Sequence, residues 1–240
     1  NFPVRWSANF GYGYGMPLFE FYGPLPYFIS SLFYLAGFSL SFAVKSLFVL
    51  ANIITVVGAY LLGREKFGRL GGLILSAFYV LAPYRAVNFF VRGALSEAWG
   101  MAFLPWVLWG AWLCWRQQNL GFGVVALGTG CLILSHNLTA LIALPFLLFL
   151  VLAWWFFEER LDYRRFLVKN FKKISQLFAS FFLGLGLSAF YSIPALLEKN
   201  LTQLDFITQT NYFDFHNHFL YLRQFFQENW GYGGSAWGPD

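Results

Sequence analysis

Residues 138–173 read LTALIALPFLLFLVLAWWFFEERLDYRRFLVKNFKK, an apolar run followed at once by the most basic segment of the chain. About 20 consecutive apolar residues are needed to cross the hydrocarbon core of a bilayer as a helix. The stretch therefore predicts a transmembrane helix that ends at a basic interface with two Trp residues as anchors. Further apolar runs that predict spans lie at 41–62, 70–83, 98–115, 120–135 and 174–196.

Three gaps between these runs collect the positive charge. GREKFGR (63–69), WRQQN (115–119) and 158–173 hold ten of the 16 Lys and Arg residues with four acidic residues, whereas the rest of the chain holds six basic and seven acidic residues. Short basic loops face the cytoplasm. The asymmetry predicts six spans, with both ends of the chain and the remaining gaps on the outer side.

The segment 24–38 (PLPYFISSLFYLAGF) is apolar but too short to cross. Its Tyr and Phe residues suit an interfacial helix on the outer face. The predicted fold is an all-α, polytopic transmembrane helical bundle that forms a single domain over 1–240. We expect 1–40 to be an outer loop with the interfacial helix, 41–197 to hold six spans, and 198–240 to be a second outer loop.

Composition supports a membrane protein and excludes other classes. Only 11% of the residues are charged, against about 25% in an ordinary soluble domain. The net charge of +5 sits beside apolar runs and forms no nucleic-acid-binding stripe, so the expected partners are membrane lipids and no nucleic acid. Cys114 and Cys131 lie inside apolar runs, which argues against a disulfide framework.

Arg85, Arg92 and Glu97 lie in the outer gap YRAVNFFVRGALSEAWG (84–100). Ionisable residues near the membrane are costly to bury and mark candidate functional sites. Glu97 follows Arg92 by five residues, which is not an ideal helical spacing, but a turn at Gly93 can bring the two side chains together. The pair then either binds a ligand or staples the loop to the next helix.

His136 and Asn137 end one apolar run and begin the next, again on the outer side. One reading is a helix-capping turn, in which Ser135 or Asn137 accepts from free backbone N–H groups. The other is a functional histidine that carries a proton or donates to a phosphate.

Two weaker candidates lie in the outer loops. Asp214, His216 and His218 alternate in DFHNH, which puts them on one face of an extended stretch and allows a divalent metal site; a solvated loop is the alternative. Glu20 is a candidate catalytic base, or else a cap of the interfacial helix.

A family resemblance is carried by GYGYGMPLFEFYGPLPY (11–27), LLGREKFG (61–68), YRAVNFFVRGALSEAWG, LSHNLTAL (134–141) and WGYGGSAWG (230–238). The chain resembles a bacterial membrane-protein family labelled "6-pyruvoyl-tetrahydropterin synthase-related", which looks like part of the GT-C glycosyltransferase superfamily. Nothing resembles a soluble pterin enzyme with a His triad.

The resemblance implies a bacterial plasma-membrane enzyme whose outward face moves a sugar from a polyprenyl-phosphate donor to an acceptor. It implies an acidic catalytic motif just after a first span. This chain starts downstream of that point, so we expect a fragment without the catalytic Asp. Phosphate contacts would then fall to Arg92, with Arg85 or His136. The alternatives are a secondary transporter or flippase and a non-catalytic assembly subunit.

Overall fold

The computed structural model describes residues 3–159, 162–202, 216 and 222. Every regular element in these ranges is a helix, apart from one isolated β-bridge between Ser7 and Met16. The chain divides into two compact units, 1–193 and 194–240. The first unit contains the helices that carry the candidate site. The helical content of the described residues confirms the predicted all-α class.

Helix α3 (Leu40–Val80) is a helical hairpin and not one straight rod. It starts at Ser39, whose side chain accepts from the N–H of Phe42. At Gly68 the backbone leaves helical geometry (φ 74°, ψ −173°), a conformation that glycine adopts readily. The Ser76 hydroxyl then donates to the Val56 carbonyl at 3.2 Å. The limbs 40–67 and 69–80 therefore lie antiparallel, as the sequence predicted for the two apolar runs.

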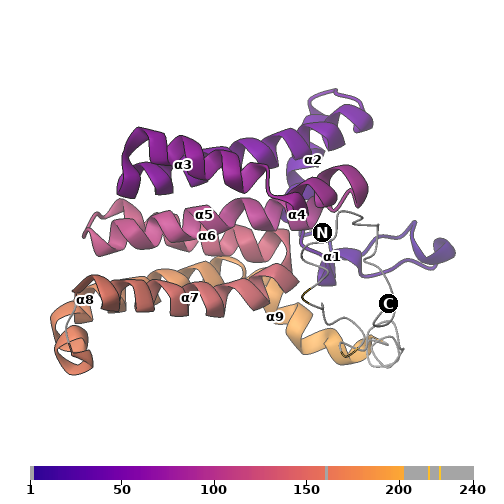
Figure 1. Cartoon of the computed structure of the whole chain (residues 1–240). Coiled ribbons are helices and arrows are strands. Elements are labelled where there is room, and N and C mark those ends of the chain that lie inside the picture. Colours follow the sequence, from indigo (N-terminus) through magenta and orange to yellow (C-terminus); the bar gives the residue numbers. More distant parts are fainter. Residues whose placement is uncertain (1–2, 160–161, 203–215, 217–221, 223–240) are drawn as a thin grey trace. The chain divides into compact units, whose positions relative to one another are not determined.

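Four further long helices complete the bundle (Figure 1). They are α5 (Leu95–Trp115), α6 (Leu120–Ser135), α7 (Asn137–Glu159) and α8 (Tyr163–Leu187). Of these, α5 packs directly against α3. A buried core of aliphatic and aromatic side chains joins α5, α6, α7 and α8; its fully buried members include Val107, Val125, Val151, Trp155 and Leu177. A second core, with Leu47, Ala51, Leu95 and Trp99, joins α3 to α5.

Small residues allow the helices of this bundle to approach closely. A Cβ placed on Gly121 of α6 would lie 2.8 Å from the Gly110 carbonyl oxygen of α5. A Cβ on Gly184 of α8 would lie 2.6 Å from the Thr129 Cβ of α6 and 2.7 Å from the Ala126 carbonyl oxygen. Membrane helices associate through such contacts, because lipid supplies no hydrophobic force between them.

Short helical elements precede, connect and follow the long helices along the chain. At the start of the chain are η1 (Gly11–Gly13), α1 (Leu18–Phe21) and α2 (Leu25–Leu35); α4 (Pro83–Ala86) and η2 (Val87–Val91) connect α3 to α5; α9 (Ala189–Glu198) and η3 (Lys199–Leu201) follow α8. Helix α2 matches the predicted interfacial segment. Its 11 residues make about 16 Å of helix, too short to cross a bilayer.

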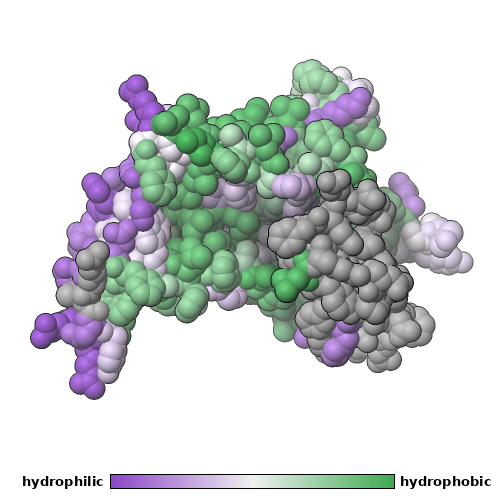
Figure 2. Space-filling model, viewed as in Figure 1, coloured by the Kyte–Doolittle hydropathy of each residue, from purple (hydrophilic) through white to green (hydrophobic). Residues whose placement is uncertain are grey.

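The basic segments gather at one end of the bundle, as predicted. Lys66 from the α3 hinge forms an ion pair with Glu158 of α7 at 2.8 Å, and its ammonium lies 4.3 Å from the centre of the Trp154 ring. Lys173 of α8 lies 3.8 Å from the ring centre of Trp115. Figure 2 shows this hydrophilic end beside the apolar middle of the bundle. We call it the basic end.

The basic gap 158–173 is mostly helical within the described residues, so the helix that follows it begins earlier than the predicted span. Helix α7 continues to Glu159, and α8 begins at Tyr163 instead of 174. The side chain of Asp162 caps α8 by accepting from the N–H groups of Arg164 and Arg165. Phe166 is buried in the core of the bundle. The basic residues therefore extend an amphipathic helix whose apolar face continues the core.

Two described helices are long and apolar enough to cross a membrane, Leu40–Val80 and Asn137–Glu159. The bent pair of α8 with 189–201 is a third candidate. Helix α5 has 21 residues and α6 has 16, so α6 is shorter than the usual span. These observations support a membrane protein, whereas six crossings stay a prediction.

The glycine contact between α6 and α8 generates a test with a matched control. Gly184→Ala should lower the free energy of unfolding by about 1–3 kcal/mol, because the added methyl group clashes with backbone and Thr129. Gly186→Ala meets no atom within 4 Å and should raise stability slightly, as expected for Gly→Ala in a helix. Thermal unfolding in detergent compares the two variants; equal effects would contradict the close packing.

Candidate functional site

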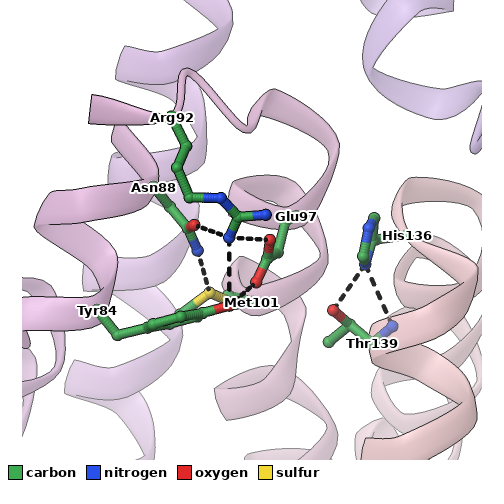
Figure 3. A network of polar contacts seen from close by, with 7 residues as sticks. All are labelled: Tyr84, Asn88, Arg92, Glu97, Met101, His136 and Thr139. Atoms are coloured by element: carbon green, nitrogen blue, oxygen red, sulfur yellow. Dashed lines mark hydrogen bonds and ion pairs between the residues drawn. The ribbon is translucent and has the colours of Figure 1, made fainter. Parts of the chain in front are cut away.

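A polar network forms where the α4–η2 segment meets the start of α5. Nη1 of Arg92 donates to Asn88 Oδ1 at 2.7 Å and to Glu97 Oε2 at 2.9 Å, and it lies 3.4 Å from the Tyr84 hydroxyl. The Tyr84 hydroxyl donates to the other Glu97 oxygen. Figure 3 shows Tyr84, Asn88 and Glu97 around the guanidinium of Arg92. The predicted Arg92–Glu97 contact is confirmed.

Local backbone geometry creates this convergence. The π-helical segment η2 ends at Arg92, and Gly93 follows with a φ of +58°. That left-handed turn reverses the chain before α5, so that Arg92 and Glu97 face each other across it. Tyr84, Asn88 and Arg92 recur every four residues and share a face of the segment. This spacing was the available sequence signal for Tyr84 and Asn88, which our prediction missed.

The Glu97 carboxylate is a shared acceptor in the network. It accepts from both Tyr84 and Arg92. Burial and the hydrogen bond to Glu97 both raise the pKa of Tyr84, so this hydroxyl stays protonated and donates. The Glu97 side chain is 13% exposed, whereas that of Arg92 is 42% exposed. Glu97 is thus the inner anchor, and Arg92 reaches the surface.

His136 caps helix α7 and lies next to the network. Its Nδ1 accepts from the Thr139 N–H at 3.2 Å and lies 2.7 Å from the Thr139 hydroxyl oxygen (Figure 3). The predicted capping turn is confirmed: Asn137 Oδ1 accepts from the Leu138 N–H at 2.9 Å, and the His136 imidazole adds a cap to Thr139 that the sequence did not predict. The buried Ser135 hydroxyl has no hydrogen-bond partner among the described residues. Since Nδ1 accepts, the neutral ring carries its proton on Nε2.

His136 also packs against α5, because a Cβ on Gly100 would lie 2.9 Å from its Cβ. Burial lowers the pKa of His136, while the charge of nearby Glu97 raises it and that of Arg92 lowers it. The side chain therefore lies within electrostatic reach of the ion pair. At neutral pH the net lowering keeps the ring uncharged, with an Nε2–H donor.

Asn137 anchors the N-terminal segment to the junction of α6 and α7. Its Nδ2 donates to the Phe21 carbonyl at 3.1 Å, and the Tyr191 hydroxyl donates to the same oxygen at 3.0 Å. Gly23 sits directly on the Ser135 carbonyl, where a Cβ would clash. These contacts hold α1, with Glu20, beside His136 and Asn137.

Glu20 occupies a small pocket at this junction. It is 4% exposed, and its Oε2 lies 3.5 Å from Nε of Arg5. Its Oε1 is buried without a hydrogen-bond partner among the residues described. The pocket has a volume of about 10 Å³, which is room for about one water molecule, and its walls include Phe19, Phe28, Phe190 and Tyr191. Helix α2 starts without a side-chain cap, so the predicted capping role for Glu20 is wrong.

Arg85 lies apart from the other predicted residues. Its side chain is buried, with 2% exposure, and Nη2 donates to Asn52 Oδ1 of α3 at 3.0 Å. The guanidinium carbon lies 5.5 Å from the ring centre of Tyr79 and 5.1 Å from that of Phe89. Sequence reasoning missed Asn52, which gave no signal beyond one amide in an apolar run.

The predicted metal site cannot be followed in space. Asp214 and His218 lie outside the described residues, and His216 is described as exposed. Within the described ranges no group of three or more His, Cys, Asp or Glu residues could hold a metal ion. Cys114 and Cys131 are both free thiols.

Comparison with known proteins places the chain in a family. A protein of Lactococcus lactis subsp. cremoris (strain MG1363), called "Uncharacterized protein", is 31% identical over 196 residues, which cover 79% of this chain and 31% of the relative. The chain thus spans about a third of that relative's length. No solved structure matches. A family model matches residues 19–235. The chain therefore belongs to the membrane-protein family described as the 6-pyruvoyl-tetrahydropterin synthase related domain.

Proposed function

We propose that this chain forms the outward-facing site of a bacterial plasma-membrane glycosyltransferase of GT-C type, which moves a sugar from a polyprenyl-phosphate donor to an acceptor. The observation that carries the proposal is the exposed Arg92, held by buried partners at the end of an apolar bundle opposite the basic end. A lipid-linked sugar phosphate has a matching form, since its tail belongs in the bilayer and its charged head at the interface.

Arg92 is arranged to meet a phosphate. All of its described hydrogen bonds are made by Nη1. Nε and Nη2 form the other edge of the guanidinium, and that edge can bind two phosphate oxygens at once. Because Glu97, Asn88 and Tyr84 fix Nη1, little side-chain freedom remains to be lost on binding.

His136 can supply a second, neutral donor. Its Nδ1 is occupied by the cap to Thr139, which leaves Nε2–H to donate to a phosphate or sugar oxygen. A donor fixed before substrate binds stabilises negative charge that develops in the transition state. Arg92 and His136 together would stabilise the departing phosphate.

Glu20 is the candidate base within this chain. In the proposed step, its carboxylate takes the proton of the acceptor hydroxyl, and the acceptor oxygen attacks the anomeric carbon. The bond from that carbon to the phosphate oxygen breaks, and its electron pair leaves with the phosphate. The unpartnered Oε1 supports this role, since it leaves one carboxylate oxygen free to take the hydroxyl proton. An acidic residue outside this sequence is the alternative base.

A transporter or flippase is the second candidate function. Transporters place polar residues near the bilayer midplane on broken helices, and Arg85 contacts α3 at Asn52, near the middle of the 40–67 limb. Full-length protein in proteoliposomes separates the two functions. A polyprenyl-phosphate sugar would be consumed by a transferase in the presence of acceptor, whereas a flippase would move it unchanged. A non-catalytic assembly subunit would do neither.

Arg92→Ala should abolish sugar transfer, a loss of at least about 100-fold, because it removes the phosphate contact. The protein should stay inserted and folded, since a partly exposed ion pair contributes only about 0–1 kcal/mol. Arg116→Ala is the matched control: Arg116 is exposed at the basic end of α5 and should transfer normally. Unchanged activity in Arg92→Ala would rule out the phosphate role.

His136→Asn separates the cap from the donor. Asn is a good N-cap residue, so the thermal stability of the variant should match that of the wild-type protein. Transfer should fall about 10-fold or more, because Nε2–H is lost. A stability loss with unchanged specific activity would assign His136 to the helix cap alone.

Glu20→Gln keeps the volume of the side chain and removes its basicity. Transfer should drop about 100-fold or more while donor binding is retained, because only the base is lost. Binding is measured by titration with the polyprenyl-phosphate sugar. Full activity in Glu20→Gln would move the base to a residue outside this chain.

A further inference from the structure

We propose that Arg85 and Asn52 form a second oxyanion site, which takes a phosphate group from the lipid side of the α4–η2 segment. The inference rests on the proposed function in its choice of ligand, a polyprenyl phosphate, but its test measures binding and not transfer.

The described surroundings of Arg85 do not balance its positive charge. The described part of the chain places no carboxylate in an ion pair with it, and its hydrogen bond goes to the neutral amide of Asn52. Nε and Nη1 are buried without a hydrogen-bond partner among the described residues. A buried guanidinium with unused N–H groups is costly at membrane depth, and its planar fork fits a phosphate or carboxylate. Arg92 differs, because Glu97 already balances its charge.

The contacts of Arg85 and Arg92 lie at different depths along the bundle. The indole N–H groups of Trp99 and Trp106 donate to the carbonyls of Leu47 and Ile54, which fixes α5 on α3 in parallel register. That register sets Glu97 level with residue 45 of α3. Asn52 is seven residues farther along, about 10 Å at a rise of about 1.5 Å per residue. The partners of Arg85 and Arg92 are therefore about 10 Å apart along the axis of α3.

Apolar side chains on either side of Arg85 in the sequence are exposed on the surface of the protein. Those of Leu81 and Phe90 are 75% and 87% exposed. In a bilayer these side chains face lipid. A phosphate carried on an apolar chain can approach from that side, whereas a free ion would have to leave water. The π-helical turn η2 follows Arg85 closely in the chain, and such turns are often found at functional sites.

The test uses Arg85→Met in the full-length protein in nanodiscs, with Arg116→Met as the control for lost positive charge. If Arg85 served only the fold, its removal would lower the Tm of the protein. Replacing an unmatched buried ion by an apolar side chain is instead neutral or stabilising. We expect the Tm of Arg85→Met to equal or exceed that of the wild-type protein, and polyprenyl phosphate to bind it about 10- to 100-fold more weakly.

Three probes identify the ligand chemistry: polyprenyl phosphate, the corresponding polyprenol and inorganic phosphate. The variants are compared in an Arg92→Ala background, which removes the phosphate contact proposed at the surface. There polyprenyl phosphate should raise the Tm of the parent and Arg116→Met proteins but not that of Arg85→Met, and Arg85→Lys should respond weakly because it lacks the fork. A response to inorganic phosphate that Arg85→Met abolishes would keep the site and make free phosphate its source.

Several results would overturn the proposal. They are failure of Arg85→Met to fold, equal binding of polyprenol and polyprenyl phosphate, a parent protein that responds to no probe, and an Arg85→Met protein that responds like the parent. Transfer and binding are measured separately, so the two proposals can fail independently. Arg92→Ala tests sugar transfer, whereas the response of Arg85→Met to polyprenyl phosphate tests only the second phosphate site.

Discussion

Two indole hydrogen bonds set the geometry on which the rest of the first unit depends. Trp99 and Trp106 donate to backbone carbonyls of α3 at 3.0 and 2.8 Å. Each bond fixes α5 along the axis of α3, which apolar packing alone leaves free to slide. With α5 held, the start of that helix presents Glu97 to Arg92, and Gly100 receives His136. A change of register by one turn would shift the site by about 5 Å.

Much of this arrangement could be predicted from the sequence, because its causes are local. Apolar run length and basic gaps located the helices and the basic end, and Gly93 indicated the turn that joins Arg92 to Glu97. The start of α8 was missed because charge was interpreted as loop, although Phe166 recurs with the apolar face of a helix. The Arg85–Asn52 and Trp99–Leu47 contacts could not be found, since they join residues far apart in the chain and depend on tertiary packing.

The site combines two kinds of electrostatic environment. Around Arg92 the charges nearly cancel, and polar neighbours hold the guanidinium in one orientation. Around Arg85 a positive charge lies among aromatic rings and one amide. Cation–π contacts partly replace the lost hydration there, but they do not neutralise the charge. This difference, and not the presence of two arginines, distinguishes a surface contact from a deep one. It is also why we assign the two residues separate roles.

The unequal limbs of the α3 hairpin have a consequence for how the protein is made. The second limb, 69–80, is about 18 Å long, and the chain after it continues as the short α4 and η2 elements. Irregular backbone at membrane depth is tolerated only where protein covers it. That cover includes α5, which the ribosome synthesises later. Contacts of this segment with α5, such as the Arg92–Glu97 ion pair, therefore form only after α5 has been synthesised, so the geometry of the candidate site is completed late.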